Sequence, residues 1–218
     1  MNNGSLAGTA PLIERVKGIL FKPKEEWLRV ESEATSQADI LKSYVLPLAA
    51  IGPVAVLLGS LVFGRSFLFV TTRPSITGAL GTAVFTYVLA IIAVFILALI
   101  ANWLAPKFNG QASPLNAFKL VAYGATAAWV AGIFNLIPAL SLFTILGLYS
   151  IYLFYTGAAP MMKIPEDKLI GYTAVTFLCA IVLNLLVTMV AGAIIGLVGL
   201  GGAVSGIGNS SSTDEVEI

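Results

Sequence analysis

Few residues in this sequence have side chains that could do chemistry, and most of those lie in apolar runs and carry no charge. Asparagine and tyrosine in such runs can hydrogen-bond either to another helix or to a polar solute. Three residues are the candidate intramembrane polar contacts: Tyr123, Asn135 and Asn184. A hydrogen bond between membrane helices contributes about 0.6 kcal/mol on average. Helix association is therefore the simpler role for Asn184, and capping of a broken helix is the simpler role for Asn135.

Several kinds of catalysis are disfavoured by what the sequence lacks. There is no histidine, and the single cysteine, Cys179, lies in an apolar run. The long apolar runs contain no Asp, Glu, Lys or Arg, so they offer neither a proton relay nor paired carboxylates or an activated nucleophile. The glycine-rich segment at 196–202 has no strand before it and no Lys-Ser/Thr after it, so it is not a phosphate loop. We predict no catalytic residue, no metal ligand and no cofactor.

The composition indicates a membrane protein. Hydrophobic residues make up 58% of the 218 residues and charged residues 11%, whereas a soluble domain has about 45–50% apolar and about 25% charged residues. So few charges cannot cover a surface that faces water. The net charge of +1 gives no field that would attract nucleic acid, so the expected environment is lipid.

Charged residues divide the apolar part of the chain into lengths that fit membrane helices, which need about 20 apolar residues each. We predict an all-α polytopic bundle with a membrane domain at 43–200, because only helices satisfy their own backbone in lipid over such lengths. A break at Asn135–Pro138 separates the third and fourth spans, since the residue before proline disfavours helix. For 191–208 an additional crossing is the alternative to a long fifth helix. The five predicted spans are 43–64, 78–103, 120–137, 139–159 and 170–200.

The distribution of Lys and Arg predicts the orientation. Six of these residues precede the first span: Arg15, Lys17, Lys22, Lys24, Arg29 and Lys42. With a cytoplasmic N-terminus, only Arg65 and Arg73 lie outside. We therefore predict a prokaryotic cytoplasmic membrane protein with its N-terminus inside, its C-terminus outside, a disordered segment at 1–11 and a flexible acidic tail at 201–218. The loop between Arg65 and Arg73 is expected to dip into the lipid interface as an anchor.

The segment "FKPKEEWLRVESE", residues 21–33, concentrates charge ahead of the first span. Upstream apolar residues recur at helical spacing, so 12–42 is predicted to be a cytoplasmic amphipathic juxtamembrane segment. Two helices broken at Lys22–Pro23 would lie along the headgroups, with Trp27 at the interface. Two roles remain open for this segment: it covers the ends of the bundle, or it docks a partner.

The segment "LIERVKGILFKPKEEWLRVESE" resembles the N-terminal signature of prokaryotic proteins of the Yip family, the Ypt/Rab-interacting type of membrane domain. In that signature a Phe-x-Pro motif precedes a Trp and an acidic residue, ahead of five membrane spans. The matching residues here are Phe21, Pro23, Trp27 and Glu31, which we take as candidate contacts with a partner or an interface.

A second stretch, from Tyr123 to Thr173, is similar to the same family. The resemblance covers roughly 12–195, and its matching positions are Tyr123–Gly124, Pro138, Tyr149, Tyr152, Gly157 and Pro165. It implies a five-span bundle in the membrane. The Asp-Leu-Tyr-Gly-Pro motif of eukaryotic members, which are associated with Rab-type GTPases and trafficking, is absent, so GTPase binding is not transferred.

Three functional hypotheses follow. The first is a non-enzymatic membrane protein that scaffolds, recruits a partner or organises the membrane. The second is a small carrier or channel for an uncharged or lipid-like solute, and the third and weakest is an intramembrane enzyme. The expected partners are membrane lipids, another membrane or cytoplasmic protein, and a second copy of the chain through Gly192 and Gly196; nucleic acid is not expected.

Overall fold

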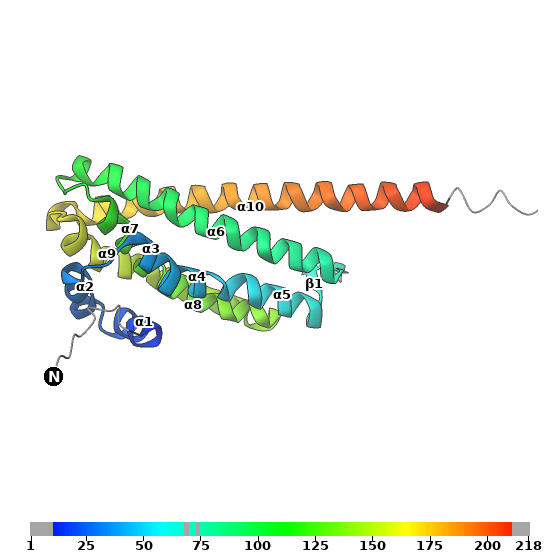
Figure 1. Cartoon of the computed structure of the whole chain (residues 1–218), viewed down its shortest axis with the longest axis horizontal. Helices are drawn as coiled ribbons and strands as arrows, with labels where there is room; N and C mark the ends of the chain where they lie inside the picture. The colour runs from blue at the N-terminus through cyan, green and yellow to red at the C-terminus, as the bar shows by residue number, and fades with distance from the viewer. Residues whose placement is uncertain (1–10, 68–69, 73–74, 211–218) are drawn as a thin grey trace, which may run out of the picture.

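The computed structural model describes residues 11–67, 70–72 and 75–210, with side chains described for 11–64 and 75–193. Within these ranges the chain is a bundle of long helices with one short β-hairpin (Figure 1). Five helical segments are long and apolar enough to cross a membrane, which confirms the all-α polytopic bundle. These candidate spans are Gln37–Phe63, Ile76–Phe108, Pro114–Leu136, Pro138–Met162 and Glu166–Ala193.

The amino-terminal arm, which we define as residues 12–33, contains two short helices. Helix α1 spans Leu12–Phe21 and α2 spans Pro23–Ser32. Lys22 separates them, and Pro23 takes the first position of α2, where its missing N–H has no cost. Both helices lie at the end of the bundle opposite the hairpin (Figure 1).

The first candidate span is an irregular helix. It comprises α3 (Gln37–Ile40), a π-helical turn at Leu41–Val45, α4 (Leu46–Ala49) and α5 (Ile51–Phe63). Ser36 begins it with a capping box: its hydroxyl accepts from the Asp39 N–H, and the Asp39 carboxylate accepts from the Ser36 N–H. The helix therefore begins before residue 43, where the sequence-based span began.

A hairpin joins the first and second spans. Strand β1 (Arg65–Phe67) pairs antiparallel with β2 (Val70–Thr72). The sequence analysis expected an interfacial anchor here, but the side chains of 65–74 lie outside the description.

The middle of the chain forms the second, third and fourth spans. Helix α6 (Ile76–Leu104) ends in a 3₁₀ turn, η2 (Ala105–Phe108). The third span joins α7 (Pro114–Gly124), α8 (Thr126–Ala131) and the 3₁₀ segment η3 (Gly132–Leu136). The backbone of Ile137 is extended. The helix therefore breaks within Asn135–Pro138, as the sequence analysis predicted. The fourth span joins the 3₁₀ segment η4 (Pro138–Leu148) and α9 (Tyr149–Met162).

The last element is one long helix, α10 (Glu166–Ser210). The segment 191–208 continues this helix instead of forming a separate one, and the predicted boundary at residue 200 falls inside it. The acidic residues at 214–217 and the start of the chain at 1–10 lie outside the described residues.

The core of the bundle surrounds the third span. Its apolar window is 61% buried, against 33% or less in the other four spans. The largest buried side chains include Trp27, Phe118, Tyr123 and Tyr172, all near the end that carries the arm. Many large apolar side chains on α6, on η4 and on α10 up to residue 193 are exposed, as expected for helices that face lipid.

Candidate functional site

Trp27 attaches the arm to the bundle. Its side chain is 0% exposed, and its indole Nε1–H donates a hydrogen bond to the Leu153 carbonyl oxygen at 3.1 Å. The ring lies against Gly157, where a Cβ would clash with the indole, and meets Tyr123 edge to face at 6.3 Å between centroids. The prediction that Trp27 lies at the lipid interface is therefore wrong, because Gly157 leaves room for the ring and Leu153 supplies its hydrogen-bond acceptor.

A buried arginine holds the two arm helices together. Arg15 is 2% exposed, and its Nη1 donates to the Glu26 carboxylate at 2.6 Å. Its other terminal nitrogen forms an ion pair with Glu33, and its guanidinium lies 5.6 Å from the centroid of the Tyr123 ring. Two carboxylates and an aromatic face thus surround one buried cation, the arrangement that makes a buried charge tolerable.

A lysine from the third span completes this cluster. The predicted third span, 120–137, leaves Lys119 just outside it, but Lys119 lies within α7 and is 2% exposed. Its Nζ donates to the backbone carbonyl oxygens of Val30 at 2.9 Å and Glu33 at 2.7 Å. A cation bonded to the last carbonyls of a helix complements the helix dipole, so Lys119 holds the C-terminal end of α2. The third span therefore contains an ionisable residue, which the predicted span 120–137 did not.

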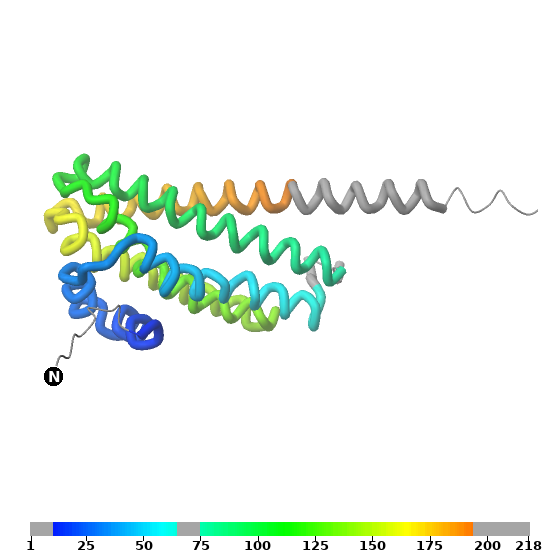
Figure 2. Tube along the Cα trace, in the orientation of Figure 1, coloured from blue at the N-terminus to red at the C-terminus, as the bar shows by residue number. Residues whose placement is uncertain are grey.

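Two further contacts join the arm to the second stretch of family resemblance. Lys163 forms an ion pair with Glu31, and the Tyr149 hydroxyl donates to the Leu20 carbonyl oxygen at 3.1 Å. The trace in Figure 2 shows the arm beside the end of α9. The two stretches that resemble the family, far apart in sequence, thus form one contact, which we call the docking site. It comprises Arg15, Glu26, Trp27, Glu33, Lys119, Tyr123, Leu153 and Gly157.

The four candidate partner contacts from the signature do not form one exposed surface. Phe21 is 80% exposed and points away from the core, whereas Pro23 and Trp27 are buried. Glu31 is partly buried and is paired with Lys163. Only Phe21 is thus available to a partner in the docked conformation.

The charged members of the docking site were missed by sequence reasoning. Arg15 was counted only as a basic residue ahead of the first span, although it precedes the buried Ile19 by one helical turn and shares its face. Glu26 precedes Trp27 directly, and its burial follows from that of Trp27. The burial of Arg15 and Glu26 depends on which face of the arm lies against the bundle, and the sequence does not specify that face.

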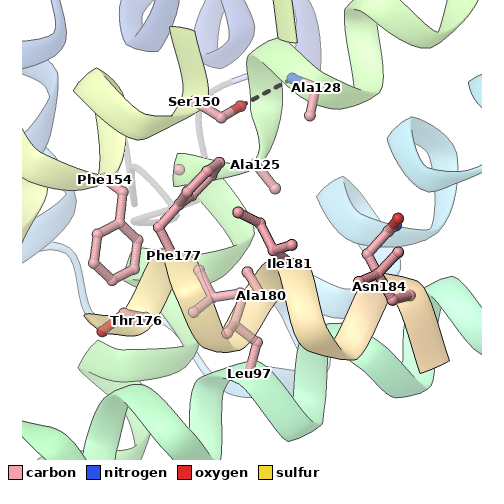
Figure 3. Close-up of a pocket in the computed structure, with 13 residues that line it drawn as sticks. Leu97, Ala125, Ala128, Ser150, Phe154, Thr176, Phe177, Ala180, Ile181 and Asn184 are labelled. Atoms are coloured by element: carbon pink, nitrogen blue, oxygen red, sulfur yellow. Dashed lines mark hydrogen bonds between the residues drawn. The ribbon is translucent and has the colours of Figure 1, made fainter. Parts of the chain in front are cut away.

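A second feature is a cavity within the membrane-spanning part, with a volume of about 400 Å³. Side chains of α7, α8, α9 and α10 line it, with Leu97 from α6 on one side (Figure 3). Its walls are chiefly apolar, and its side-chain polar groups come from Ser150, Thr176 and Asn184. The Ser150 hydroxyl oxygen accepts a hydrogen bond from the Ala128 N–H at 2.9 Å.

The three candidate intramembrane polar residues have different surroundings. Tyr123 belongs to the docking site and also meets Tyr44 edge to face at 4.6 Å. The Asn135 Nδ2 donates to the Gly132 carbonyl oxygen at 3.1 Å within η3, a local contact in line with the capping role. Asn184 is exposed on α10 and lines the cavity. The three residues therefore do not form one site.

Neither feature has the geometry of a metal centre. Among the side chains that the structure describes, no three His, Cys, Asp or Glu residues lie close enough together to hold a metal ion. The carboxylates of Glu26 and Glu33 are already neutralised by Arg15. What the docking site can do is fix a helical arm to a membrane bundle, and what the cavity can do is accommodate an apolar molecule.

Comparison with known proteins agrees with this architecture. No curated protein and no solved structure matches the chain. The family model described as the Yip1 domain matches residues 17–189, which include most of the arm, the first four candidate spans and most of the fifth. This multi-pass membrane chain, with its arm docked on five apolar helices, belongs to the Yip1 domain family.

Proposed function

We propose that the protein is a non-enzymatic scaffold that recruits a protein partner to the cytoplasmic face of a prokaryotic membrane. The observation that carries this proposal is the two-sided arm. Its inner face is fixed to the bundle by the docking site, while Ile13, Phe21 and Leu28 on its outer face are 69%, 80% and 62% exposed. Large apolar side chains presented on a fixed support are a common feature of recognition surfaces.

The position of the basic residues supports an orientation with the arm in the cytoplasm. Figure 1 places the arm at the same end of the bundle as the link between α6 and α7 and the link between α9 and α10. Those links carry Lys107 and Lys163. The positive-inside rule assigns this end to the cytoplasm, with the C-terminus outside.

The outer face suits a protein partner of mixed character. Exposed charges of both signs, including Glu14, Lys17 and Glu25, lie among the three apolar residues. Apolar anchors within a charged rim are typical of transient protein interfaces. Either another membrane protein or a cytoplasmic protein could present the complementary surface.

Photocrosslinking in native membranes tests this proposal. A photoreactive amino acid at Leu28 should capture a discrete partner, and Phe21→Asp should abolish that capture. Lys42→Ala, at an exposed position outside the arm, is the control and should leave capture intact. Unchanged capture in Phe21→Asp would refute recruitment through this face. A point variant is preferable to deletion of 12–33, because deletion would also remove Arg15 and Trp27 from the core.

The cavity favours a second candidate function, a carrier for an uncharged or lipid-like solute. Its volume falls within the range of about 300–1,000 Å³ that is typical of small-molecule sites. Asn184→Leu combined with Thr176→Val should then abolish solute flux in proteoliposomes while the protein remains folded. Unchanged flux would exclude this cavity as a transport route.

A further inference from the structure

The first candidate span contains an irregular stretch. Its residues Leu41–Val45 form a π-helical turn, Pro47 follows that turn, and Ala50 separates α4 from α5. Proline lacks a backbone N–H, and its ring clashes with the carbonyl group four residues earlier. Helices bend at prolines and at π-helical turns, and such turns are frequent at functional sites. We call Leu41–Ala50 the hinge.

The third span bends beside the hinge. Helix α7 ends at Gly124 and α8 begins at Thr126. The Thr126 hydroxyl donates its proton to the Tyr123 carbonyl oxygen. The hydroxyl of Tyr44, in the hinge, is therefore the donor in its 2.7 Å contact with the Thr126 oxygen. Tyr44 and Thr126 are 3% and 0% exposed, so two buried hydrogen bonds join the bend of the third span to the hinge of the first.

The first and third spans pack closely beyond these two bends. A Cβ on Gly59 of α5 would lie 2.5 Å from the Leu136 carbonyl oxygen, and a Cβ on Gly132 would lie 3.1 Å from the Gly52 Cα. Only glycine permits two backbones to approach so closely, so α5 and η3 hold each other along their length. We call α5 and η3 together the outer unit. The hinge connects it to the rest of the first span, and α8 and the bend connect it to α7.

The arm contacts this junction through Tyr123. The Tyr123 ring meets Tyr44 at 4.6 Å and Trp27 at 6.3 Å between centroids. The Arg15 guanidinium lies 5.6 Å from the same ring. Because buried side chains are close-packed, displacement of the arm changes the space available to Tyr123 and, through it, to Tyr44.

We propose that docking of the arm controls the hinge. The docked arm holds the Tyr123 ring against Tyr44 and keeps the outer unit in its present position. Release of the arm frees the ring, and the outer unit then rotates about the hinge relative to α6 and α10. This gives the arm an effect inside the membrane-spanning part, so it goes beyond recruitment and holds with or without a partner. A partner that binds only the docked arm would favour the present position of the outer unit.

The first experiment asks whether the hinge affects the arm. Val30 is 0% exposed in the docked arm, so the rate of maleimide reaction with Val30→Cys reports release, in a Cys179→Ser background of the full chain in proteoliposomes. Tyr44→Phe keeps the ring and removes its hydrogen bond to Thr126. It should raise the rate about three-fold, part of the roughly five-fold factor that one hydrogen bond represents. Thr126→Val should do the same, and Thr126→Ser should restore the rate.

Tyr172→Phe is the matched control for the loss of a buried hydroxyl. Tyr172 is 0% exposed, and its hydroxyl donates to the Ala101 carbonyl oxygen at 3.0 Å, between α10 and α6. This variant should leave the rate unchanged. Equal rates in Tyr44→Phe and Tyr172→Phe would overturn the proposal.

The second experiment asks whether the arm affects the outer unit. Spin labels at Val62 of α5 and Leu186 of α10, which are 64% and 54% exposed, report the distance between the outer unit and α10 by pulsed electron resonance. Arg15→Met combined with Trp27→Ala releases the arm and should change the mean distance by at least about 3 Å. The reason is that a rotation of about 10° moves the end of α5, roughly 20 Å from the hinge, by that amount.

Labels at Leu99 of α6 and Leu178 of α10 are the control, because both helices lie outside the outer unit. Their separation should be the same in both states of the arm, which also verifies that the released variant is folded. An unchanged distance between Val62 and Leu186 would overturn the proposal, because coupling between two sites acts in both directions. Neither experiment uses a partner, so photocrosslinking from Leu28 tests recruitment separately.

Discussion

The docking site and the cavity lie in the same bundle but differ in packing density and in charge. The docking site is dense and charged, with Trp27 at 0% and Arg15 at 2% exposure, and both terminal nitrogens of Arg15 and the Nζ of Lys119 have partners. The cavity is uncharged and incompletely filled, and Thr176 of its lining has a buried hydroxyl group without a partner among the described residues. The difference teaches that this chain uses its buried charge to fix the arm and leaves unfilled space where helices face lipid.

Removal of Trp27 should have the largest effect on the dense side of this comparison. Trp27→Ala deletes a fully buried ring and one hydrogen bond, so arm docking should weaken by about 4 kcal/mol. The measurement is the rate of maleimide reaction with the thiol introduced by Val30→Cys, at a position that is 0% exposed, in a Cys179→Ser background. Leu28→Ala, at a 62% exposed position, is the matched control and should leave the thiol protected. A thiol equally protected in both variants would mean that Trp27 does not hold the arm.

Removal of the buried Arg15 cation should cause the second-largest loss of arm docking. Arg15→Met leaves Glu26 and Glu33 buried without their ion-pair partner, which should weaken docking by about 3 kcal/mol in the same assay. Lys22→Met removes an exposed cation of the arm that, among the described residues, pairs with Glu25 alone, and it should have little effect.

Neutralising the carboxylates tests whether unbalanced buried charge is what weakens docking in Arg15→Met. In Arg15→Met combined with Glu26→Gln and Glu33→Gln, no unbalanced charge remains, so thiol protection should recover substantially. A triple variant as reactive as Arg15→Met would show that Arg15 acts through its packing and not through its charge.

A pair of glycine substitutions compares the packing of the two regions directly. Gly157→Ala places a Cβ against the Trp27 ring and should cost about 2 kcal/mol of arm docking. Gly124→Ala, at the cavity, places a Cβ at an ordinary 3.5 Å from Phe154 and should leave the thermal stability in detergent unchanged or slightly raised. Equal losses of stability in Gly157→Ala and Gly124→Ala would show that the two regions are packed equally tightly.

The exposed ion pair should have the smallest effect. The side chains of Lys163 and Glu31 are 48% and 31% exposed, and ion pairs of this kind contribute less than about 1 kcal/mol. Lys163→Met should therefore raise the thiol reactivity only a few-fold, and the effect should shrink in 1 M salt because of screening. A loss as large as that of Arg15→Met would show that this pair belongs to the docking site.

The helical architecture could be predicted because it follows from local properties of the chain. Runs without charge specify membrane helices through their length alone, and Pro138 and Pro23 mark a break and a helix start through their fixed backbone geometry. The limits of the spans were less predictable. Lys119 was expected to end an apolar run, but its position inside α7 became favourable only through the carbonyl groups of α2, more than eighty residues earlier.

The sequence by itself determined that this protein is a five-span α-helical bundle with a charged amphipathic arm, because hydropathy and charge act residue by residue. Only the tertiary structure decided which face of the arm is buried, which charges are neutralised inside, and where the bundle leaves a cavity. These features depend on how distant side chains fit together: the space over Gly157 receives Trp27, and the hydroxyl group of Thr176 finds no partner among the helices around it. Such complementarity is a property of pairs of surfaces, which no single segment of the chain specifies.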